Sequence, residues 1–190
     1  MSFPDSIGDH RRAVLEMLTE SFRDPAKTSL LRTRGISMLP FLRDGDEIGV
    51  RGLDPRTLAV GSIVAFRAGD LLLVHRVAAI AGRDGQQKLW ERGDNNMYMT
   101  VVAGSRLLGQ VFEVRLGHRR LDLDARRFRL VGLLVALHGR LAVKLYDRIR
   151  RIGRRLLRPG SAGSQAARRV IYALLLAPSR ALLIFARRLL

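Results

Sequence analysis

The pattern of hydrophobic and polar positions changes twice along the chain. Apolar residues first recur every three or four positions over residues 9–22, which predicts an amphipathic helix lying on the domain. From Thr33 onward, short apolar segments alternate with Gly, Asp and Pro, a pattern typical of strands joined by tight turns. The predicted strands cover residues 47–51, 62–67, 71–80, 87–92 and 107–116. These signals indicate a mainly β fold, an antiparallel, barrel-like domain.

The last part of the chain returns to a helical period. One apolar stripe and an adjacent basic stripe predict a basic amphipathic helix over residues 140–158, which a Pro- and Gly-containing stretch at 159–163 ends. The segment 168–190 is strongly apolar but contains Pro178 and Arg180. No run of about 18 residues is free of charge, Pro or frequent Gly, so we expect this segment to lie in an interface and not to span a bilayer.

Charge divides the chain in the same place. The net charge is +17, yet residues 1–114 hold 15 Lys or Arg against 14 Asp or Glu, whereas residues 115–190 hold 19 against 3. We therefore predict an N-terminal helix and linker over residues 1–32, a β domain over 33–116 and a basic α-helical tail over 117–190. The marked excess of Arg over Lys favours a GC-rich bacterial source.

Several kinds of chemistry are unexpected in this composition. The chain has no Cys, which excludes disulfides, thiolate zinc sites and cysteine nucleophiles. No two of its four histidines have the spacing of a zinc-binding helix; they are His10, His75, His118 and His138. We expect no metal and no cofactor.

Five short motifs follow one another in the β domain. The first runs Gly35-Ile36-Ser37-Met38-Leu39-Pro40, and the others are Gly45-Asp46, Gly61-Ser62-Ile63-Val64, His75-Arg76-Val77 and Gly93-Asp94-Asn95-Asn96. In this order they resemble the conserved boxes of the type I signal peptidases, in the archaeal and endoplasmic-reticulum branch whose base is His. The resemblance covers residues 35–114 and implies a fold of the signal peptidase and LexA type.

The resemblance assigns roles to individual residues. It implies that Ser37 is the nucleophile and His75 the general base, and it places Gly35, Met38 and Pro40 in the substrate-binding segment. A neutral imidazole suits the task of the base near neutral pH. Lys88 does not match the lysine box of other members, so we do not expect a Ser–Lys dyad. The backbone N–H of Ser37 is one expected oxyanion donor, and the sequence does not reveal the second.

The orienting acid is absent from its expected place. In the His-type branch it lies six positions beyond the Asp of the last motif, which is Thr100 in this chain. Asp94 is the carboxylate that we expect to hold the His75 ring; the alternative is that Asp94 bonds its own turn. In that case the domain is a catalytically impaired, signal peptidase-like peptide-binding module.

The resemblance therefore predicts a serine endopeptidase that cleaves an extended leader or signal-like peptide after a small residue. A LexA-like regulator ranks last, since that group uses a Lys base and a DNA-reading domain ahead of it. The Leu-rich basic tail favours an anionic membrane surface as a partner, with a protein partner next and nucleic acid unexpected. We expect a peripheral membrane location on the cytoplasmic face, with the cytoplasm as the alternative.

Overall fold

The computed structural model describes residues 6–53, 58–82, 88–156 and 162–188. These residues form three α-helices, one short 3-10 helix and eight strands. In chain order the elements are α1 (Ser6–Ser21), β1 (Thr28–Arg32), β2 (Glu47–Gly52), β3 (Ile63–Ala68), β4 (Leu71–Ala81), β5 (Lys88–Arg92), β6 (Thr100–Ala103), η1 (Gly104–Arg106), β7 (Leu107–Leu116), β8 (Arg119–Asp122), α2 (Arg126–Leu156) and α3 (Ala162–Arg188).

The strands form one antiparallel sheet. Its order is β1-β2-β7-β3-β4-β5-β6, and β8 pairs with β7 beside this path. The prediction of a mainly antiparallel β fold with helices at the C-terminal end is confirmed. The sheet curves around a core, but β1 and β6 at its two ends do not pair with each other, so it is not a closed barrel.

The five predicted strands are present with shifts of at most one residue at their ends. Three further strands escaped prediction because they are short and carry little periodic signal. They are β1, β6 and β8, and β8 holds one buried residue, Leu121, among Arg and Asp. Gly, Asp and Pro also predict tight turns at residues 54–55 and 83–85, and both lie outside the described residues.

The main hydrophobic core draws on the whole length of the chain. It contains Phe22 from the segment after α1, Val50 and Val111 from the sheet, and Val135 and Leu183 from the two C-terminal helices. The boundaries 1–32, 33–116 and 117–190 remain a prediction, although the three parts share this core.

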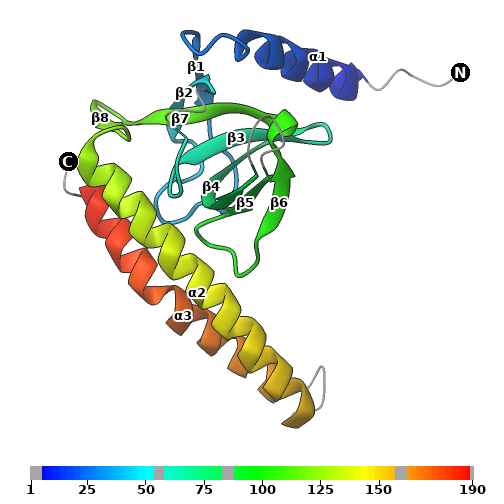
Figure 1. Cartoon of the computed structure of the whole chain (residues 1–190), viewed down its shortest axis with the longest axis vertical. Helices are drawn as coiled ribbons and strands as arrows, with labels where there is room; N and C mark the ends of the chain where they lie inside the picture. Colours follow the sequence, from blue (N-terminus) through cyan, green and yellow to red (C-terminus); the bar gives the residue numbers. More distant parts are fainter. Residues whose placement is uncertain (1–5, 54–57, 83–87, 157–161, 189–190) are drawn as a thin grey trace, which may run out of the picture.

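The C-terminal helices form a hairpin that packs against the sheet and extends beyond it (Figure 1). α2 begins at Arg126, well before the predicted start at residue 140, and α3 continues through Pro178 without a break. We expected no segment able to span a bilayer. The helix over Gln165–Arg188 is in fact long and apolar enough to do so by length and composition, with a mean hydropathy of 1.6.

Close contact between glycines fixes α2 on the sheet. A Cβ on Gly132 of α2 would lie 2.7 Å from the carbonyl oxygen of Gly61, which precedes β3. A Cβ on Gly61, whose φ is +98°, would lie 2.4 Å from the backbone of Leu133. Both positions therefore need a residue without a side chain.

Candidate active site

Ser37 lies in the loop that connects β1 with β2. Gly35 turns the chain two residues earlier with a φ of +96°, and its N–H donates to an Asp44 carboxylate oxygen at 2.8 Å. The backbone N–H of Leu39 donates to the Ile36 carbonyl at 3.2 Å. Ser37 thus lies in a tight turn that its own loop holds, partly exposed to solvent.

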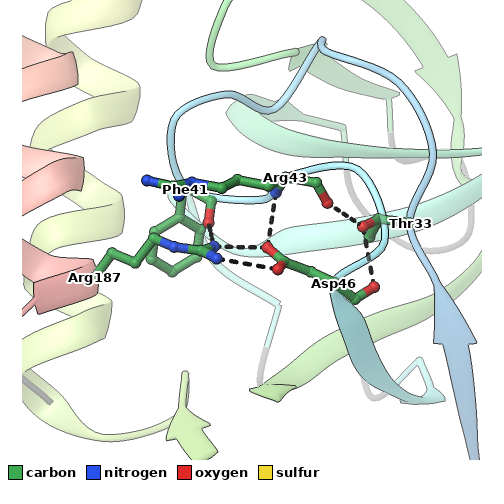
Figure 2. A network of polar contacts seen from close by, with 5 residues as sticks. All are labelled: Thr33, Phe41, Arg43, Asp46 and Arg187. Carbon is green, nitrogen blue, oxygen red and sulfur yellow. Dashed lines mark hydrogen bonds and ion pairs between the residues drawn. The ribbon is translucent and has the colours of Figure 1, made fainter. Parts of the chain in front are cut away.

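A second set of contacts fixes the far end of the same loop (Figure 2). The Asp46 carboxylate accepts the N–H of Arg43 at 2.7 Å and both terminal nitrogens of Arg187, at 2.6 and 3.0 Å. Arg187 also donates to the Phe41 carbonyl at 2.5 Å, and the Thr33 hydroxyl donates to the Arg43 carbonyl at 2.6 Å. A side chain of α3 therefore holds the β1–β2 loop, residues 33–46. We call it the nucleophile loop after the role that the sequence motifs predict for Ser37.

His75 comes to Ser37 from the middle of β4. Its Nε2 lies 3.0 Å from the Ser37 Oγ, within hydrogen-bonding distance. The ring is 7% exposed and lies 5.9 Å from the Phe66 ring, centroid to centroid. The structure brings together the two side chains that the motifs singled out.

The carboxylate on the other side of the ring is Glu91 of β5. Its Oε2 lies 2.5 Å from His75 Nδ1, and the Glu91 side chain is only 6% exposed. A carboxylate paired in this way favours the His75 tautomer with its proton on Nδ1, and in that neutral tautomer Nε2 is an acceptor for the Ser37 hydroxyl. Ser37, His75 and Glu91 form a continuous hydrogen-bonded chain.

Asp94 does not orient the His75 ring, so that expectation was wrong. Its two oxygens accept from Arg76, at 2.8 Å from Nε and 2.7 Å from a terminal nitrogen. Arg76 and Asp94 are both buried, and a buried ion pair needs this two-bond geometry to offset the lost hydration. Thr100 lies in β6, where its pairing partner is Glu91.

Glu91 was not identified from the sequence, because in the signal peptidases that the motifs resemble the orienting acid lies after the Gly-Asp-Asn-Asn motif, and Glu91 lies before it. A signal was present in the predicted β4–β5 hairpin, where an acid follows the apolar pair Leu89-Trp90. Pairing puts Glu91 opposite Val77, and a register irregularity follows between Val77 and Ala79. Residues two apart on facing strands are diagonal neighbours, which brings Glu91 to His75.

The Gly93-Asp94-Asn95-Asn96 turn supports the nucleophile loop directly. The backbone N–H of Asn95 donates to the Ser37 carbonyl at 2.8 Å, and its side-chain Nδ2 donates to the Ile36 carbonyl at 3.1 Å. A Cβ on Gly93 would lie 2.7 Å from the Ser37 carbonyl oxygen, so only glycine allows this approach. The motif positions the serine.

A second buried arginine lies behind this turn. Arg92 donates to the Asn96 carbonyl at 2.7 Å, and its guanidinium contacts the backbone of α2, where a Cβ on Gly139 would lie 2.4 Å away. Burial lowers the pKa of Arg92 from its ordinary value, and the charge of Asp94 opposes that shift. Asp94 pairs directly with Arg76, and its charge also acts on Arg92, one of whose terminal nitrogens is buried without a hydrogen-bond partner among the described residues.

A pocket of about 260 Å³ opens beside Ser37. Of the three residues predicted to bind substrate, Gly35 and Met38 line it and Pro40 does not; their role in binding stays a prediction. Its walls come from the β1 end, the nucleophile loop and the first residues of β4, and the apolar lining side chains are Leu31, Met38, Leu42, Ile48, Leu72, Leu73 and Val74. The site therefore combines a polar chain of three residues with an apolar pocket.

No three His, Asp or Glu side chains gather into a cluster able to hold a metal ion within the part of the chain that the structure describes.

An antiparallel β domain with a serine, histidine and carboxylate in hydrogen-bonding sequence is the architecture of a serine peptidase-like protein. The chain belongs to the Peptidase S24-like family, whose model matches residues 3–111. The match includes α1, which the sequence motifs had left outside the resemblance, and it ends before α2 and α3. Comparison with curated proteins and with solved structures gave no significant match.

Proposed function

We propose that this protein is a serine endopeptidase of signal-peptidase type, with Ser37 as nucleophile, His75 as general base and Glu91 as the orienting acid. The observation that carries the proposal is the hydrogen-bonded chain from Ser37 Oγ through both ring nitrogens of His75 to Glu91. Buried between neighbouring strands, the imidazole and carboxylate are held in place before any substrate binds.

In the proposed reaction, Ser37 Oγ forms a bond to the substrate carbonyl carbon while its proton passes to His75 Nε2. The tetrahedral intermediate collapses as the C–N bond breaks, and His75 returns the proton to the leaving amine. Water then hydrolyses the acyl-enzyme by the same route. Glu91 keeps the ring in the required tautomer and stabilises the imidazolium that forms at each step.

An extended peptide is the substrate that fits the pocket. β1 pairs only with β2 among the described strands, and β4 pairs with β5 only from Arg76 onward. Two unpaired strand edges therefore flank the pocket, where a peptide can add as a further strand. The small apolar pocket beside Ser37 supports cleavage after a small residue.

The test is labelling by a fluorophosphonate probe together with cleavage of a co-expressed leader-type peptide. Wild-type protein is expected to be labelled at Ser37 and to cleave, and Ser37→Ala is expected to do neither. A peptide-binding module without catalysis would retain peptide but show no labelling in either form, and that result would overturn the proposal.

We also propose that the α2–α3 hairpin places the enzyme on an anionic membrane surface. Its exposed apolar side chains include Leu134, Leu137 and Leu141 of α2, and Val170 and Leu174 of α3. Leu141 is 64% exposed and Leu174 is 68% exposed. Spacings of three or four residues place the first three on one face of α2 and the last two on one face of α3.

Charge favours lipid as the occupant of this surface. α2 also carries exposed arginines, among them Arg148, Arg150 and Arg151, and the segment 115–190 holds 19 basic against 3 acidic residues. A basic amphipathic surface of this kind fits the anionic cytoplasmic leaflet. The polar side chains Arg180 and Arg187 bond to the β domain, which supports a helix that lies on the bilayer and does not leave the domain to cross it.

A further inference from the structure

Asn95 links the C-terminal helix to the nucleophile loop through all its polar groups. Its N–H and Nδ2 donate to Ser37 and Ile36, at 2.8 and 3.1 Å. Its Oδ1 accepts a hydrogen bond from Arg180 of α3 at 2.6 Å, and its carbonyl accepts the Tyr172 hydroxyl, also of α3. The turn is therefore held between α3 and the serine.

Arg180 determines which way the Asn95 side chain faces. A guanidinium group can only donate hydrogen bonds, so it selects the oxygen of the Asn95 amide. With Oδ1 turned to Arg180, Nδ2 faces the loop and donates to the Ile36 carbonyl. The opposite orientation would place two donors together at α3 and two acceptors together at Ile36.

The Ile36 carbonyl and the Ser37 N–H belong to one peptide unit. Such a unit is planar and trans, so its C=O and N–H point in opposite directions, and fixing the carbonyl fixes the N–H. The N–H of Ser37 has no hydrogen-bond partner among the described residues. It is available to a substrate oxygen.

We propose that Arg180 is a positioning residue for the oxyanion donor of this site. It holds the Asn95 amide, which holds the Ile36–Ser37 peptide with its N–H free for the developing oxyanion. The proposal rests on the proposed function. It gives α3, which lies outside the residues that match the family model, a part in catalysis.

The first test is the rate of fluorophosphonate labelling, because the phosphonyl oxygen of the probe occupies the oxyanion position. Arg180→Met is expected to slow labelling about 10- to 100-fold, because the Ser37 N–H would no longer be held in position to donate to the oxyanion. Asn95→Asp is expected to slow it similarly, since a carboxylate still accepts from Arg180 but cannot donate to Ile36. Arg180→Lys, which keeps a donor, is expected to recover part of the rate.

The matched control is Arg169→Met, which removes an exposed arginine from the same helix and should leave the rate unchanged. Amide hydrogen exchange gives a readout that does not need activity. Exchange at the backbone N–H groups of Leu39 and residue 95, which donate to the carbonyls of Ile36 and Ser37, is expected to rise in Arg180→Met and in Asn95→Asp but not in the control.

The outcomes separate the two proposals. If wild-type protein is labelled and Arg180→Met is labelled within twofold of the same rate, this inference is wrong while the proposed function stands. If wild-type protein is not labelled, the proposed function fails, and unchanged exchange at Leu39 and Asn95 in Arg180→Met then rejects the positioning role as well. Equal slowing by Arg180→Lys and Arg180→Met would also overturn the positioning role, because Lys can still donate to Asn95 Oδ1 and should restore part of the labelling rate.

Discussion

At the scale of single residues, two buried carboxylates three positions apart have different tasks. Glu91 contacts His75, whereas Asp94 contacts Arg76, and each side chain has at most 6% of its surface exposed. The strand and the turn that carry them point the two side chains to different neighbours. Substitution should therefore separate an effect on catalysis from an effect on stability.

Glu91→Gln is expected to abolish most of the activity. The amide can present its NH₂ group to Nδ1, which favours the wrong ring tautomer, and the comparable change in a serine protease triad lowers kcat by about 10⁴-fold. Labelling rate and peptide cleavage measure this. The control is Asp94→Asn, which leaves Arg76 as a buried cation without its counter-charge and should lower the free energy of unfolding by about 3–5 kcal/mol. Reversed effects would contradict the assignment.

His138 of α2 gives the molecule a stability that depends on pH. Burial lowers the pKa of its ring, and the charge of Arg92 lowers that pKa further; Nδ1 lies 3.1 Å from the Ser179 Oγ. The unfolded chain, with a His pKa of about 6.5, then binds the proton more readily than the folded chain. The stabilising contribution is therefore complete above that value and falls as the pH drops through it.

His138→Gln is expected to reduce the loss of unfolding free energy between about pH 7.5 and pH 5.5, measured by urea denaturation at each pH. The exposed His118, in the turn between β7 and β8, provides the control His118→Gln, which should leave the pH dependence as it is in the wild type. If the unfolding free energy of His138→Gln depends on pH as it does in the wild type, a group other than His138 is responsible for that dependence.

At the scale of elements, the position of α2 depends on backbone contacts that a side chain would prevent. Gly132 approaches the Gly61 carbonyl, and Gly139 approaches Arg92. A third glycine of the same helix, Gly153, has nothing within 4 Å of where a Cβ would be. Gly153 can therefore serve as a control for Gly132 and Gly139 within the same helix.

Gly132→Ala is expected to destabilise the protein by about 1–3 kcal/mol, because the new methyl group forces α2 away from β3. Gly153→Ala is expected to stabilise it by up to about 1 kcal/mol through the higher helix propensity of Ala. Chemical denaturation of both variants measures the difference. Similar changes in both would mean that α2 is not held by the Gly61 contact.

At the scale of the whole molecule, the hairpin has side chains bonded to the β domain and others exposed to solvent. Arg180 and Arg187 of α3 face the nucleophile loop and its supporting turn, while Leu174 and Val170 remain exposed. The active site and the proposed membrane surface therefore share one helix. Docking on a bilayer would leave the bonds to the β domain intact.

Binding to vesicles tests the membrane proposal. The full chain is expected to float with vesicles of phosphatidylglycerol and phosphatidylcholine and much less with phosphatidylcholine alone, with binding weakened by salt. Leu134→Glu combined with Leu141→Glu is expected to weaken binding at least about tenfold, since two exposed leucines no longer enter the bilayer. Val101→Glu, an exposed apolar position on β6, is the control.

Other occupants of the hairpin surface would give different results. A stable dimer in solution that the double Leu→Glu variant disrupts, without vesicle binding, would replace the lipid by a second copy of the chain. Binding to nucleic acid that equals or exceeds binding to anionic vesicles would likewise contradict the proposal.

The sequence was sufficient for the features that depend on neighbouring residues. Short apolar segments separated by Gly, Asp and Pro predicted β2, β3, β4, β5 and β7, because turn-forming residues end a strand and the apolar residues between them fill buried positions. The motifs around Ser37 and His75 identified the pair that the fold brings to 3.0 Å, since a stiff glycine turn and an apolar strand are both local structures.

The identity of the carboxylate was decided by tertiary structure alone. Strand register and the irregularity after Val77 bring Glu91 to the His75 ring, and a shift by one residue would turn it to the other face of the sheet. The role of α3 was equally hidden, because Arg180 and Asn95 are far apart in the chain and meet only when the hairpin folds back. Composition and periodicity specified that this segment is basic and helical, whereas only packing determined that Arg180 contacts Asn95 and that Arg187 contacts Asp46.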